Sequence, residues 1–161
     1  MNLRSTNVTV FLAVYVYPSE REMAIYHYEA ALEIASSHNW DDALFWAYYS
    51  LAILFFTEGR LVDANAHIER AKSHVVNNAY HLALAMELQV GLRCTMGMFE
   101  EAKFKALRVV DAFEKLGATA RAERTKGHLR WIETKMSKGK PPEMVLLLMR
   151  TDFLFSAPEK G

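Results

Sequence analysis

The chain has 161 residues, half of them apolar and a quarter charged, so it is long enough to form one globular domain with a substantial core. Lysine plus arginine equals aspartate plus glutamate at 19 each, and this balance excludes a general electrostatic attraction to nucleic acid or to an anionic membrane. Four prolines and seven glycines favour long helices over a turn-rich β protein. The single cysteine excludes an internal disulfide and fits a reducing, cytoplasmic compartment.

The first apolar segment, residues 7–17, is too short to span a bilayer and lacks the cleavage pattern of a signal peptide. Its valines and threonine favour a strand by propensity. No second segment resembles a partner strand, and an isolated strand leaves its backbone unpaired, so a buried helix is the preferred interpretation.

Periodic apolar residues then predict a series of helices, separated by glycine, asparagine or serine. Ser19 is a candidate N-cap, the pair Asp41-Asp42 opens the most apolar helix, and glycines at 59, 97 and 117 mark helix ends. The predicted helices are 20–35, 41–57, 61–76, 80–96, 99–116 and 118–136, followed by a short one after Pro141-Pro142.

Two of the turns share a sequence pattern. Gly59-Arg60-Leu61-Val62-Asp63-Ala64 and Gly97-Met98-Phe99-Glu100-Glu101-Ala102 both place an apolar residue two positions, an acid four and alanine five after the glycine. Ala24 ends a weaker third copy, so the three alanines are 40 and 38 residues apart. A constant period of this length predicts helix–turn–helix repeats in which alanine permits close approach of two helices.

The repeat resembles the tetratricopeptide repeat (TPR). The sequence of residues 20–136 is also similar to the C-terminal repeat arrays of fungal NACHT or NB-ARC signalling ATPases. The phosphate-binding motif of such ATPases is absent from this sequence. The resemblance implies a single domain over 1–161 with units at 5–37, 41–76 and 79–116 and capping helices at 118–155. It implies an all-α, right-handed superhelix of antiparallel helix pairs, about seven helices in all. The positions that match the family pattern are Tyr48, Leu51, Ala52, Phe55, Gly59, Leu61, Ala64, Ile68 and Ala71.

The helix at 41–57 is apolar on nearly every side, so either other helices cover it or one side binds a partner. The stripe formed by Tyr48, Leu51, Ala52 and Phe55 is expected to pack internally. The resemblance places the other side in a concave groove. The candidate partner-binding residues are Trp46, Tyr49, Ile53, Phe56, Glu87 and Arg124.

No arrangement of residues predicts catalysis, a cofactor or a metal. His67, His74 and His81 recur every seven residues but are expected to be surface groups, because Asn77-Asn78 interrupts their helix. Residues 117–140 carry seven cations against two acids, which could bind an acidic peptide or phosphate or could be a solvated outer face.

The sequence therefore predicts a non-catalytic scaffold that binds a protein or peptide partner, without nucleic acid or membrane. The alternative is self-association, or docking within a larger assembly, through the apolar termini at 7–17 and 144–155.

Overall fold

A computed structural model describes residues 21–138, and this part of the chain is all α-helical. It contains six helices, and no strand occurs between residues 21 and 138. Their bounds are α2 (Arg21–Ser37), α3 (Asp41–Thr57), α4 (Leu61–Ser73), α5 (Ala79–Thr95), α6 (Phe99–Lys115) and α7 (Thr119–Lys138). The helices predicted at 7–17 and after Pro141-Pro142 lie outside the described residues.

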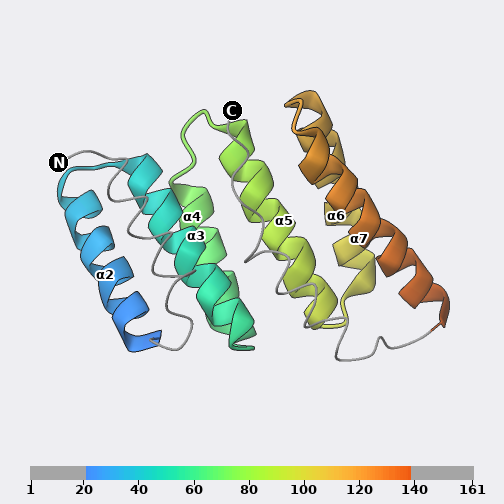
Figure 1. Ribbon diagram of the computed structural model, residues 1–161, viewed down its shortest axis with the longest axis horizontal. Coiled ribbons are helices and arrows are strands. Elements are labelled where there is room, and N and C mark those ends of the chain that lie inside the picture. Colours follow the sequence, from blue (N-terminus) through green and yellow to red (C-terminus); the bar gives the residue numbers. More distant parts are fainter. Residues whose placement is uncertain (1–20, 139–161) are drawn as a thin grey trace. The chain divides into compact units, whose positions relative to one another are not determined.

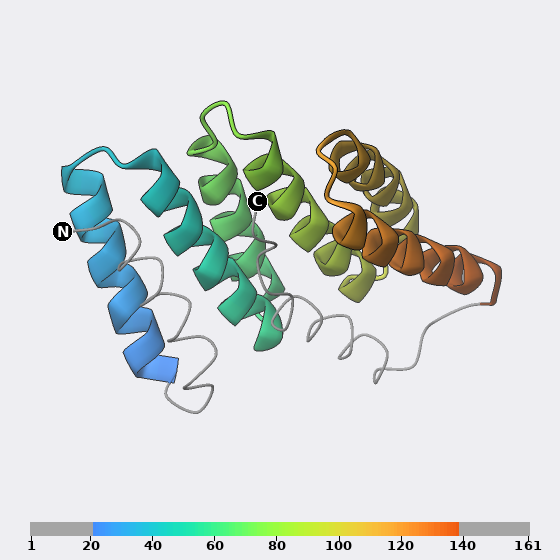
Figure 2. The same ribbon diagram turned by 45° about the horizontal axis from the view of Figure 1, so that its top comes forward.

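The chain divides into two compact units between Asn77 and Asn78. In the first unit, α3 packs against both α2 and α4; in the second, α6 packs against both α5 and α7 (Figures 1 and 2). Consecutive helices within a unit are joined by short turns, which makes neighbours antiparallel.

The turns within the units share one backbone geometry. Gly59, Gly97 and Gly117 have φ of 76°, 74° and 70°, a left-handed conformation that glycine adopts without steric cost. After Gly59, the Arg60 N–H donates to the Phe55 carbonyl at 2.9 Å, while the Gly59 N–H donates to Phe56 at 3.0 Å. This pair of bonds is a Schellman motif, which satisfies carbonyls that the helix end would otherwise leave unpaired.

The same bonding recurs at the other turns. Met98 donates to Arg93 at 2.8 Å after Gly97, and Ala118 donates to Phe113 at 2.9 Å after Gly117. Between α2 and α3, Asn39 takes the left-handed position at φ 53°. The glycines predicted to end α3, α5 and α6 therefore do so by one mechanism.

The buried faces of α2, α4 and α6 share one pattern, which begins with alanine in each helix. Each helix buries residues at the same three places, spaced by four and three positions, which is one face of a helix. The three sets are Ala24, Tyr28 and Ala31; Ala64, Ile68 and Ala71; and Ala102, Ala106 and Val109. The repeated alanines identified from the sequence are thus all core residues.

Most predicted boundaries agree with the structure to within two residues, and the largest difference is at the end of α4. Helix α4 ends at Ser73 rather than Val76. His74 and Val75 donate to carbonyls only three residues back, and Asn77 is left-handed at φ 50°. The adjacent valines have low helix propensity because their branched Cβ atoms are restricted against the preceding turn. Asn78 then caps α5 by accepting a hydrogen bond from the His81 N–H at 3.0 Å.

A buried tyrosine of α2 fixes that helix to α3. Tyr28 is fully buried, and its side chain hydrogen-bonds with Ser50. Burial raises the pKa of Tyr28 well above its ordinary value, since the charged phenolate would lose its hydration.

Cys94 is expected to be unreactive in the folded protein. It is buried in α5, and burial raises the pKa of its thiol to about 12, so only a very small fraction is thiolate near pH 8. A thiol-reactive chromophore near pH 8 should therefore label the native chain far more slowly than the chain in denaturant, with Cys94→Ala as the unlabelled control. Rapid stoichiometric labelling of the native chain would contradict the buried position.

Candidate functional site

The four apolar candidates on α3 are mostly inaccessible. Phe56 is fully buried, Tyr49 and Ile53 retain 7% and 8% exposure, and Trp46 is half-buried. Three aromatic rings form one cluster along the helix. Phe45 stacks on Tyr49 with ring centroids 5.6 Å apart, and the Trp46 ring lies nearly perpendicular to both, at 5.2 and 5.8 Å. Trp46 is consequently the candidate with the most surface available to a partner.

The opposite side of α3 is buried as well. Leu51, Ala52 and Phe55 are core residues, as the sequence indicated, and Tyr48 is half-buried. Burial alone therefore does not divide α3 into a packing face and a binding face, because both sides of the helix are covered.

The two charged candidates meet in the second unit. Glu87 of α5 is fully buried, and its carboxylate accepts hydrogen bonds from Arg121 Nη1 at 2.7 Å and Arg124 Nη2 at 3.1 Å. The Thr125 hydroxyl lies 3.3 Å from the same carboxylate. Glu87 thus has no surface for direct contact with a partner, and its visible role is to hold two guanidinium groups of α7.

The arginines of this network have different surroundings. Arg121 is buried and lies over the rings of Tyr80 and Phe113, at 5.8 and 5.9 Å from their centroids. The Arg124 side chain keeps 26% of its surface exposed. Two guanidinium groups share the Glu87 carboxylate, and Arg124 is the one whose side chain reaches solvent.

Sequence reasoning missed Arg121 and Thr125. Their spacing to Arg124, within one turn of α7, placed the three side chains on one side of that helix. Nothing in the sequence paired them with Glu87, which is 34 residues before Arg121. The only available signal was an acid within an otherwise apolar helix, since such an acid requires a cationic partner when buried.

Two other polar residues of α5 also have partners on α6. Gln89 is buried and accepts a hydrogen bond from Lys105 Nζ at 3.2 Å, while Arg93 lies 3.0 Å from the carboxylate of Glu101. These contacts give two polar side chains of α5 partners on the neighbouring helix α6.

His67 and His74 are half-buried and take part in the contact between α3 and α4. His67 lies against the Phe55 ring at 4.9 Å, and His74 stacks on Tyr48 at 5.7 Å while its Nδ1 is 3.0 Å from Asp41. His81 is buried in α5, so its prediction as a surface group is wrong.

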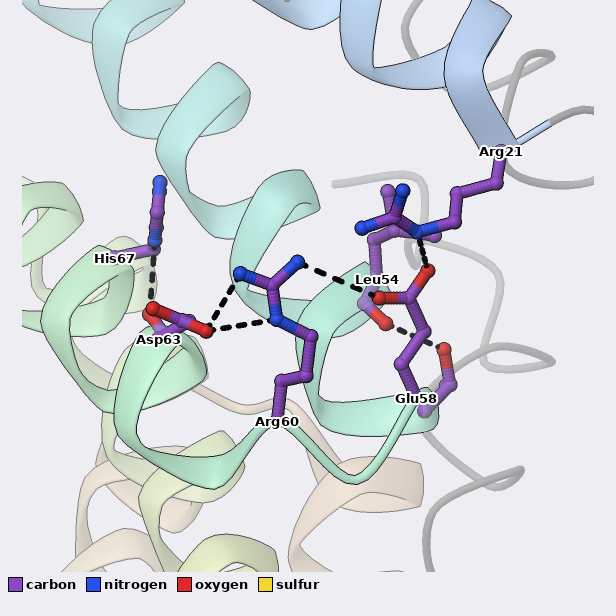
Figure 3. A network of polar contacts seen from close by, with 7 residues as sticks. Arg21, Leu54, Glu58, Arg60, Asp63 and His67 are labelled. Carbon is purple, nitrogen blue, oxygen red and sulfur yellow. Dashed lines mark hydrogen bonds and ion pairs between the residues drawn. The ribbon is translucent and has the colours of Figure 1, made fainter.

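A polar network joins the start of α2, the α3–α4 turn and the start of α4 (Figure 3). Arg21 of α2 bonds to Glu58 in the α3–α4 turn, and Arg60 of the same turn bonds to Asp63 at 2.8 Å. Arg60 also lies over the Phe55 ring, 4.4 Å from its centroid. Both acids in this network have cationic partners, so the network is explained by its role in joining these helices.

Within residues 21–138, no three histidine, cysteine or acidic side chains are grouped so that they could hold a metal ion. No described helix combines the length and apolar character needed to cross a membrane.

No family model matches the chain, and no curated protein or solved structure matches it either. Its function must therefore be inferred from the two candidate regions themselves, the aromatic cluster of α3 and the arginine pair held by Glu87.

Proposed function

We propose that this chain is a non-catalytic protein-interaction module built from TPR-like helix pairs in a right-handed superhelix, related to the repeat arrays of fungal NACHT or NB-ARC ATPases. The observation that carries the proposal is the recurrence of one helix–turn–helix arrangement. Gly59 and Gly97 are 38 residues apart, have the same backbone conformation, and are each followed by a buried alanine five positions later. Repeats of this kind present continuous surfaces to peptides or helices.

In this proposal the partner contacts the aromatic cluster of α3. Trp46 supplies the accessible ring, and Tyr49 supports it from the next turn of the helix. Ile53 and Phe56 lie further along the same face and contribute by holding the helix in place. Aromatic side chains are enriched among the residues that dominate binding energy in protein interfaces.

Affinity capture from native cells tests this assignment. Trp46→Ala and Tyr49→Ala should each reduce the amount of the captured partners, whereas Tyr26→Ala, which removes a highly exposed aromatic residue of α2, should not. Circular dichroism of each variant separates lost binding from lost folding. Partners captured equally well by folded Trp46→Ala and Tyr49→Ala would refute the α3 surface.

The alternative function is self-association through the apolar termini. The segments that motivate it, 7–17 and 144–155, lie outside the described residues. Light scattering of the purified chain distinguishes the two proposals: a dimer or larger species at micromolar concentration that is lost on deleting 144–155 would favour assembly.

A further inference from the structure

We propose that α7 carries a binding site for an acidic peptide segment, formed by Arg124, Trp131 and Lys135. This inference rests on the proposed function as a protein-interaction module and specifies the chemistry of one partner. It concerns the second unit alone and does not require the α3 surface.

The charges of α7 are only partly compensated. Lys126 is paired with both Glu114 and Glu123, at 2.8 Å each, and Glu133 is paired with Lys103. These contacts occupy both acids of α7. Among residues 21–138, three other cations of the helix have no ion pair: Arg130, Lys135 and Lys138.

Arg124, Trp131 and Lys135 lie on one face of the helix, because their spacings of seven and four residues return to the same side. Lys135 Nζ lies 5.8 Å from the centroid of the Trp131 ring, and Phe99 of α6 presents its own ring to Trp131 at 6.1 Å. The face therefore has Arg124 at one end, Lys135 at the other, and the Trp131 ring, which packs against Phe99 of α6, between them.

The buried Glu87 positions Arg124, the cation at one end of this face. Both contacts between Glu87 and Arg124 use Nη2 of the guanidinium, which anchors this nitrogen beside the buried carboxylate while the side chain remains partly exposed. A guanidinium positioned in this way loses less side-chain entropy when it binds a carboxylate. Glu87 is accordingly a positioning residue and makes no contact with the peptide.

Charge complementarity identifies the occupant as a segment with acids at both ends and apolar residues between them. The rise of a helix places the Cα atoms of Arg124 and Lys135 about 16 Å apart, a distance that an extended peptide covers in about five residues. Peptide is favoured over nucleic acid because the chain has no net positive charge and α7 itself contains Glu123 and Glu133.

An array of fluorescent peptides tests the site, with glutamates four to six positions apart and every combination of Leu, Phe, Tyr, Val and Ala between them. Matched arrays carry glutamine or lysine in place of the glutamates. Acidic peptides should bind the full chain more tightly than both control arrays, and their binding should weaken at high salt. Arg124→Ala and Lys135→Ala should each weaken binding by about tenfold, since each removes a charge-assisted hydrogen bond.

Lys126→Ala is the matched control, because it removes a cation of the same helix that lies on the opposite side from Arg124, Trp131 and Lys135. Binding should change less than about twofold for such a substitution. Lys135→Ala keeps the test valid if Arg124→Ala disturbs the fold, since Lys135 makes no contact with Glu87. Circular dichroism confirms the folding of each variant.

Absence of binding across the acidic array, or equal effects of Lys126→Ala and Lys135→Ala, would overturn the site while leaving the capture result on α3 intact. Tighter binding of an oligonucleotide or polyphosphate, with the same dependence on Arg124 and Lys135, would overturn the peptide assignment. Loss of native partners by Trp46→Ala without loss of acidic peptides would show that the two surfaces act separately.

Discussion

Replacing Glu87 by glutamine is expected to lower the free energy of unfolding by about 3–5 kcal/mol, the usual cost of leaving one member of a buried ion pair without its partner. The substitution keeps the size of the side chain and removes its charge. Arg121 is buried against the rings of Tyr80 and Phe113 and keeps only 7% of its side chain exposed, so water replaces the lost carboxylate charge poorly. Urea unfolding followed by circular dichroism measures the change.

A double variant isolates the ionic contribution. Glu87→Leu combined with Arg121→Met replaces the buried pair by apolar side chains of similar volume, an exchange that is often neutral or stabilising. Arg124 can then turn its partly exposed side chain to solvent. We therefore expect the double variant to be more stable than Glu87→Gln. A change of less than about 1 kcal/mol in Glu87→Gln would mean that the network is far better hydrated than its burial indicates.

Phe56→Ala is expected to destabilise the first unit by about 3–5 kcal/mol, because it removes a fully buried aromatic side chain and leaves a cavity. Phe56→Leu keeps most of the volume and should cost less than about 1.5 kcal/mol. Thermal and urea unfolding provide the measurement. Tyr26→Ala on the exposed surface is the control and should stay within about 0.5 kcal/mol of the wild type.

This experiment also separates two roles for Phe56, which the sequence placed among the partner-binding residues. A core residue changes stability and affects binding only through the fold. If Phe56→Ala retained wild-type stability but lost partner capture, the ring would have to reach the surface in solution, against its complete burial in this structure.

Much of the fold could be predicted because local residues determine it. Gly59, Gly97 and Gly117 specify left-handed turns that most other residues resist, so the helix ends at these places follow from the sequence. The alanines at 24, 64 and 102 recur with the same period, and their burial follows from the close approach of helices that alanine permits.

The candidate site was less predictable because its contacts are distant in sequence. Periodicity assigns residues to faces only when a helix has a polar side, and α3 has almost none, so Trp46 could not be separated from Phe56 by pattern. The pairing of Glu87 with Arg121 and Arg124 depends on how α5 and α7 meet around α6. Local residue propensities do not predict this contact between helices. The sequence shows only that Glu87, an acid in the mostly apolar helix α5, needs a cationic partner if it is buried.

Because the turns share one geometry, the chain can be lengthened or shortened by whole periods with its turns unchanged. A duplication or loss of 38 residues, from one glycine turn to the next, adds or removes two whole helices. The carbonyls at each new helix end would still accept hydrogen bonds from the backbone N–H groups of the turn glycine and of the residue after it, as they do now. Variation by whole periods is therefore tolerated by the backbone, whereas an insertion of a few residues inside a helix would rotate its buried alanines out of the core.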